Sequence, residues 1–104
     1  MHYDKYFSRN QKVFLINISE ERDQTVFNSF TAKVQACDQE RIRLKTVYRL
    51  FSGDQPGLQP GMQFKLTTEA LGMGVQLRAE LIKVLSLDEL ELRPLGDLSV
   101  YQRR

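Results

Sequence analysis

Apolar side chains occupy every second position through several stretches of this chain, and this two-residue period constrains the fold more than any other feature. In the clearest stretch, residues 29–36, every even-numbered residue is apolar and every odd-numbered residue is polar. Residues 41–45 and 75–81 repeat the pattern. Successive side chains of a β-strand point to opposite faces, so each stretch predicts a strand with one buried face.

Turn-forming residues separate these stretches. Short polar or glycine-containing breaks at residues 37–40, 72–74 and 86–89 each predict a hairpin turn. Prolines and glycines between Tyr48 and Met62 predict a longer excursion. The apolar parity shifts by one position between Leu81 and Ile82, which predicts either a β-bulge or a sharply coiled strand. Together these signals predict an all-β protein, a single small antiparallel split β-barrel of about six strands.

The residue inventory argues against most catalytic and metal sites. A chain of 104 residues has the size of one domain. Its single cysteine, Cys37, excludes an internal disulfide, and its single histidine, His2, leaves too few ligands for a Cys- or His-based metal site and no Ser-His-Asp relay. The carboxylates outside the strands fall in predicted turns, where they are normally solvated. We therefore predict no catalytic residue, no metal and no enzymatic activity.

Apolar runs in this sequence do not exceed four residues, and no charged-then-apolar leader is present. Such runs are too short to cross a bilayer as a helix. We expect no membrane span, no signal peptide and a cytoplasmic location.

One predicted strand carries a basic face. Arg41, Arg43 and Lys45 alternate with apolar residues, and Arg49 follows closely. Such a row is able to hold an anion or an RNA backbone, but it is also typical of a solvated strand face. A net charge of only +2 and the absence of interleaved aromatic residues disfavour nucleic acid. A stand-alone barrel that binds nucleic acid through these four residues remains the alternative hypothesis.

Several segments resemble, in their order, a known bacterial family. They are Val13 and Leu15 in the first strand, then Phe30-Thr31-Ala32-Lys33-Val34, Arg41-Ile42-Arg43-Leu44, Leu58-Gln59-Pro60-Gly61-Met62-Gln63-Phe64-Lys65-Leu66, Val75-Gln76-Leu77-Arg78-Ala79-Glu80-Leu81, Leu90-Glu91-Leu92-Arg93-Pro94 and Gln102-Arg103-Arg104. This pattern looks like the N-terminal domain (YcgR-like, PilZN) of flagellar-brake proteins, the barrel that precedes a PilZ domain.

The resemblance implies a division of the chain into three parts. Residues 1–11 would form an N-terminal tail, readable as a short helix or an arm, and residues 12–96 the YcgR-like barrel. Residues 97–104 would be a linker that leads into a PilZ domain missing from this chain. The implied function is a non-catalytic regulatory module that docks to the PilZ domain in cis and to a flagellar motor protein or another target.

The resemblance also implies a ligand for the complete protein. In the family, an R-x-x-x-R segment at the junction grips cyclic di-GMP together with a D/N-x-S-x-x-G motif of the PilZ domain. Arg103 or Arg104 would match the first arginine, and paired guanidiniums suit phosphodiesters and guanine edges. The second arginine and the complete D/N-x-S-x-x-G motif do not occur in this sequence. We therefore expect the isolated domain to carry no cofactor and to bind cyclic di-GMP weakly or not at all.

Overall fold

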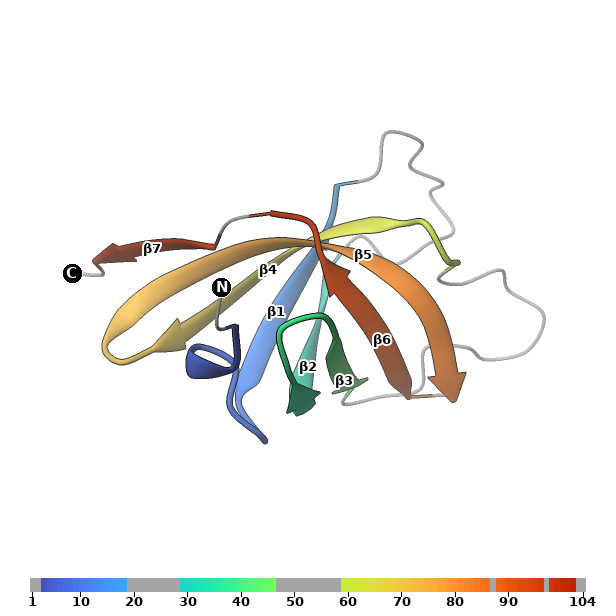
Figure 1. The fold of residues 1–104 in the computed structure, drawn as a ribbon, viewed down its shortest axis with the longest axis horizontal. Coiled ribbons are helices and arrows are strands. Elements are labelled where there is room, and N and C mark those ends of the chain that lie inside the picture. Colours follow the sequence, from blue (N-terminus) through green and yellow to red (C-terminus); the bar gives the residue numbers. More distant parts are fainter. Residues whose placement is uncertain (1–2, 19–28, 47–58, 87, 97, 103–104) are drawn as a thin grey trace.

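A computed structural model describes residues 3–18, 29–46, 59–86, 88–96 and 98–102 (Figure 1). The described part contains one short 3-10 helix and seven strands. They are η1 (Tyr3–Lys5), β1 (Lys12–Asn17), β2 (Ser29–Cys37), β3 (Ile42–Thr46), β4 (Gln63–Ala70), β5 (Met73–Ser86), β6 (Glu89–Pro94) and β7 (Ser99–Gln102). The excursion predicted between Tyr48 and Met62 lies largely outside the described residues, as do residues 19–28.

Six of the strands close into an antiparallel barrel. The strand order is β4-β1-β2-β3-β6-β5, and the pairing of β4 with β5 completes the circle. β7 lies outside this circle and pairs with the first residues of β5. The prediction of an all-β antiparallel barrel of about six strands is confirmed, with one further strand added outside it.

The core follows the predicted alternation. Every inward position of residues 75–81 is buried, as are Ile42 and Leu44 of β3 and Leu90 and Leu92 of β6. Phe30 and Phe64 meet edge to face inside the barrel, with ring centroids 5.8 Å apart and planes at 78°. The period of two therefore identified the inward faces of these strands correctly.

Bulges adjust the faces of two strands. The register of β5 against β6 shifts between Leu81 and Lys83 and again between Val84 and Ser86, which confirms the predicted bulge. A further bulge, in β2 between Val34 and Ala36, was not predicted. It leaves Ala36 exposed, although the alternation placed this residue on the apolar face of β2.

The N-terminal segment forms part of the barrel. Phe7 has only 2% of its surface exposed and belongs to the core, with Tyr3 and Tyr6 packed against the same cluster. The Tyr3 hydroxyl donates a hydrogen bond to the Gly96 carbonyl, 2.8 Å away and 93 positions along the chain. The part predicted as an N-terminal tail therefore contains a 3-10 turn and packs on the barrel core.

β4 and β5 continue beyond the barrel as a long hairpin, which we call the arm. β1 pairs with β4 only as far as Thr67, whereas β4 and β5 stay paired to Ala70 and Met73. β7 pairs with β5 within this arm, as Figure 1 shows. The structure thus places a strand in the segment that the sequence assigned to a linker.

Among the described residues, no helix has the length and apolar character that spanning a bilayer requires.

Candidate functional site

Three of the predicted site residues lie outside the described part of the chain. They are Arg103, Arg104 and Arg49, so the structure adds nothing to the predictions made for them. Of the other three, Arg43 and Lys45 lie on the outward face of β3 with exposed side chains, whereas Arg41, predicted on the same strand, directly precedes it.

Acidic residues of the neighbouring strand lie opposite this basic row. β3 pairs with β6, and the pairing sets Arg43 beside Glu91 and Lys45 beside Glu89. Glu91 also forms an ion pair with Lys83 of β5, with 3.7 Å between Nζ and Oε2. Arg43 therefore shares its outward surface with a carboxylate that a second cation also approaches.

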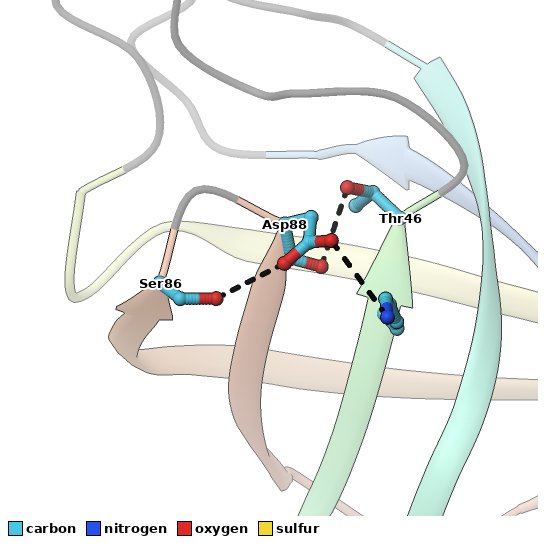
Figure 2. Close-up of polar contacts among 4 residues, drawn as sticks. Thr46, Ser86 and Asp88 are labelled. Atoms are coloured by element: carbon cyan, nitrogen blue, oxygen red, sulfur yellow. Dashed lines mark hydrogen bonds and ion pairs between the residues drawn. The ribbon is translucent and has the colours of Figure 1, made fainter.

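Lys45 faces a carboxylate that the fold holds in place. Its Nζ lies 4.0 Å from Oδ2 of Asp88, in the turn between β5 and β6. Figure 2 shows Asp88 between Ser86 and Thr46. The Ser86 hydroxyl lies 3.1 Å from Oδ1 of Asp88, and the buried Thr46 donates to the Asp88 carbonyl from its backbone N–H at 2.7 Å and its hydroxyl at 3.3 Å.

The third cation, Arg41, follows an acidic turn. Asp38 accepts hydrogen bonds from the backbone N–H groups of Glu40 and Arg41 at 2.7 and 2.8 Å. These two bonds, with a smaller contribution from the Arg41 charge, lower the pKa of Asp38 below its usual value. Asp38 therefore stays ionised beside the basic row.

Acids and bases thus alternate across the outward surface of β3. A phosphate-binding surface needs uncompensated positive charge, because its affinity comes from neutralising phosphates and releasing counterions. Here Asp38, Asp88 and Glu91 lie next to Arg41, Lys45 and Arg43, the described cations among the four on which the nucleic-acid hypothesis depends. This geometry disfavours that hypothesis.

The lone thiol lies beside the same acidic turn. Partial burial raises the pKa of Cys37 to about 12, and the nearby carboxylates of Asp4 and Asp38 add to the rise. Only the thiolate is a strong nucleophile or metal ligand. Cys37 therefore has the properties of an inert, partly buried thiol.

A second surface, on the arm, was not predicted. A shallow groove of about 370 Å³ runs between β1, β4 and β7, and we call it the arm groove. Its lining residues are Gln11, Lys12, Phe14, Thr67, Thr68, Glu69 and Tyr101. The exposed large apolar side chains of the described residues also gather in this part of the molecule: Phe14 and Tyr101 line the groove, Val100 neighbours Tyr101 on β7, and Leu71 lies at the hairpin turn.

One glutamine organises the polar side of the arm groove. The side-chain amide of Gln11 donates to the Tyr6 carbonyl at 2.8 Å and to the Thr68 hydroxyl at 2.7 Å. That hydroxyl in turn donates to the Lys12 carbonyl at 2.7 Å. These bonds connect the N-terminal segment, β1 and β4, so hydrogen bonds within the protein fix the polar side of the arm groove.

Tyr101 forms one wall of the arm groove because Gly74 leaves room for it. A Cβ atom on Gly74 would lie 2.3 Å from Cε2 and 2.4 Å from Cζ of Tyr101, far inside van der Waals contact. The sequence interpretation assigned residues 72–74 to a turn, but the turn contains Leu71 and Gly72, both at positive φ, and Gly74 lies within β5. A glycine inside a strand often marks a close approach of this kind, and that signal was available in the sequence.

Comparison with known proteins identifies the fold. No family model matches the chain, and no curated protein matches its sequence. One solved structure, the solution structure of the N-terminal domain of another protein, superimposes with a TM-score of 0.73 at 20% identity. The match covers 98% of this chain and 90% of that one. At this identity the likeness shows a shared fold, a small β-barrel used elsewhere as an N-terminal domain.

Proposed function

We propose that this protein is a non-catalytic regulatory module, the YcgR-like N-terminal domain of a cyclic di-GMP-responsive PilZ protein in the cytoplasm. The observation that carries the proposal is the position of β7, which pairs with the arm outside the closed barrel and directly precedes Arg103 and Arg104 in the sequence. A domain joined after β7 is able to change its orientation without opening any pairing of the six-stranded barrel.

Two further facts support the proposal. The segments that resemble the PilZN family, taken in their order along the chain, correspond largely to strands β1–β6. A barrel of the same fold occurs as the N-terminal domain of another protein. The acidic residues beside the cations of β3 weigh against the alternative, nucleic-acid binding.

The mechanism is a shift between two arrangements of the barrel and the PilZ domain. Cyclic di-GMP has two phosphodiesters and two guanines, and guanidinium groups at residues 103 and 104 are suited to clamp or stack on them. The ligand favours the arrangement in which it makes more contacts. The changed orientation then presents a surface to a flagellar motor protein or another target, and Phe14 and Tyr101 offer exposed apolar contacts for it.

Calorimetric titration of cyclic di-GMP tests the proposal. We expect the 104-residue chain alone to bind with a dissociation constant weaker than roughly 100 μM, and the same chain joined to the PilZ domain encoded after it to bind in the low micromolar range or tighter. In the joined protein Arg103→Ala and Arg104→Ala should each weaken binding about tenfold or more, as loss of a charge-assisted contact requires. Arg41→Ala, an exposed arginine outside the junction, is the control and should leave affinity unchanged.

Two results would overturn the proposal. One is a gene that encodes no PilZ domain downstream of Arg104. The other is a joined protein in which neither junction substitution changes the affinity more than Arg41→Ala does.

A further inference from the structure

β7 differs from the six barrel strands in the number of strands with which it pairs. Each barrel strand has neighbours on both sides along at least part of its length, whereas β7 has one neighbour, β5. The pairing consists of four residue pairs, from Met73 with Gln102 to Gln76 with Ser99. Releasing β7 therefore breaks this short ladder and leaves the barrel closed.

Tyr101 and Gly74 make a close contact within this ladder. Tyr101 pairs with Gly74, and its ring lies in the space that any other residue at position 74 would fill. Tyr101 also forms a wall of the arm groove, yet the residue is 43% exposed. Contact with Gly74 therefore holds one face of the Tyr101 ring, and burial of the side chain adds little resistance to its release.

The chain before β7 contains a defined point of rotation. The Leu95 N–H still donates to the Arg78 carbonyl of β5 at 2.9 Å, so the chain is fixed there. Gly96 follows, is exposed, and has no atom within 4 Å of the position its Cβ would take. Leu98 then packs against the core beside β7. Rotation of the backbone at Gly96 therefore moves β7, and full release of β7 also takes Leu98 off the core.

The N-terminal segment is attached at this same point. The Gly96 carbonyl accepts the hydrogen bond from Tyr3, in η1, and the adjoining Phe7 is buried in the core. The position of β7 and the position of η1 therefore share one contact, so a change in either alters the free energy of the other.

We propose that β7 is a detachable strap: Tyr101 on Gly74 seats it, Gly96 is its hinge, and Tyr3 couples it to the N-terminal segment. Tension or binding after Gln102 then shifts the strap between seated and released states and loosens η1 in the released state. This inference concerns the isolated chain and does not depend on the proposed ligand.

Amide hydrogen exchange of the 104-residue chain, followed by NMR, tests the strap. In Gly74→Ala the added Cβ displaces the ring, and protection of the β7 amides that β5 covers should fall roughly tenfold or more, while protection in β1 and β2 stays unchanged. Ser99→Ala is the control, because Ser99 is an exposed residue of β7 outside the Tyr101–Gly74 contact, and β7 should stay protected. If Gly74→Ala does not fold, Tyr101→Ala removes the seat without a clash and should give the same loss.

Two further variants distinguish the role of the Tyr101–Gly74 contact from that of the Tyr3–Gly96 hydrogen bond. In the Tyr101→Ala background, adding Gly74→Ala should produce no additional loss of β7 protection, since no ring remains to be displaced. Tyr3→Phe removes the hydroxyl and should lower protection of β7 several-fold but not that of β2 and β3. The strap is refuted if Gly74→Ala leaves β7 protected or if β7 and the barrel lose protection equally. An unchanged β7 in Tyr3→Phe refutes the coupling.

Discussion

Phe7→Ala decides whether the N-terminal segment is part of the folded barrel. The side chain is 2% exposed and lies in the core with the strand residues, although its surroundings in the sequence show no strand pattern. Phenylalanine buries about 150–250 Å². At about 25 cal/mol per Å² this area corresponds to roughly 4–6 kcal/mol, an upper limit for the transfer contribution.

The expected loss of stability is smaller than that limit. Phe→Ala substitutions in protein cores lower the free energy of unfolding by about 3–5 kcal/mol. We expect about 3 kcal/mol here, at the low end of the measured range, because Tyr3 and Tyr6 pack beside the site and are able to move into part of the cavity.

Urea unfolding followed by far-ultraviolet circular dichroism measures this loss. With a slope of about 1.5 kcal/mol per M for a domain of this size, the midpoint should fall by about 2 M at unchanged slope. Phe14→Ala is the matched control: it is the same substitution at a side chain with 40% of its surface exposed, and it should cost about 1 kcal/mol. The reasoning is refuted if the two variants lose the same stability, because Phe7 would then contribute no more than a surface residue.

Four further results are expected. Cys37 should react with iodoacetamide far more slowly than free cysteine at pH 8, because its folded pKa of about 12 lies above the ordinary value of 9.0. The stability that the neutral thiol contributes should therefore be complete below pH 9 and decline between pH 9 and 12. Cys37→Ser should abolish this decline in urea titrations. Asp38→Asn should destabilise the fold at neutral pH but not in acid. The lowered folded pKa of Asp38 gives stability that is present above its ordinary pKa of 3.8 and is lost as the pH falls through the folded pKa. Equal destabilisation at pH 2 and pH 7 would contradict a lowered pKa. Thr46→Val should lower the free energy of unfolding by about 1 kcal/mol through loss of the hydroxyl bond at a buried site, whereas Thr31→Val, on the outward face of β2, should change it by less than about 0.5 kcal/mol. Single-stranded RNA should bind weakly with a shallow salt dependence, unchanged in Arg43→Glu; steep salt dependence that Arg43→Glu abolishes would restore the nucleic-acid alternative.

The barrel was predictable because its strands are each buried on one face. Residues 75–81 contain four buried apolar positions in strict alternation, and such a pattern fits only a half-buried strand. The parity change after Leu81 marked a real bulge for the same reason. The bulge before Ala36 gave no such signal, since Cys37 and the polar turn end the alternation immediately after it.

The parts that were missed depend on contacts between distant segments. Phe7 is one aromatic residue in an aperiodic segment, and its burial depends on the closed barrel against which it packs. β7 has four residues and no alternation of its own, so its strand conformation depends on its pairing with β5. The acids that neutralise the basic row lie on β6 and in the turn before it, and only the non-local pairing of β3 with β6 brings them beside Arg43 and Lys45.

Closure of the barrel also affects how the chain behaves at high concentration. Unpaired strand edges are templates for pairing between molecules, and barrels remove them by joining the first strand to the last. On the arm, the Gln11 amide approaches Thr68 and the Glu69 carbonyl where β4 continues past β1. In the described part of the chain, β7 is the one strand with a single neighbour, and it is four residues long and followed in the sequence by two arginines. A short strand flanked by charge is a poor template, so this architecture protects the chain against edge-to-edge aggregation at the place where its sheet is left open.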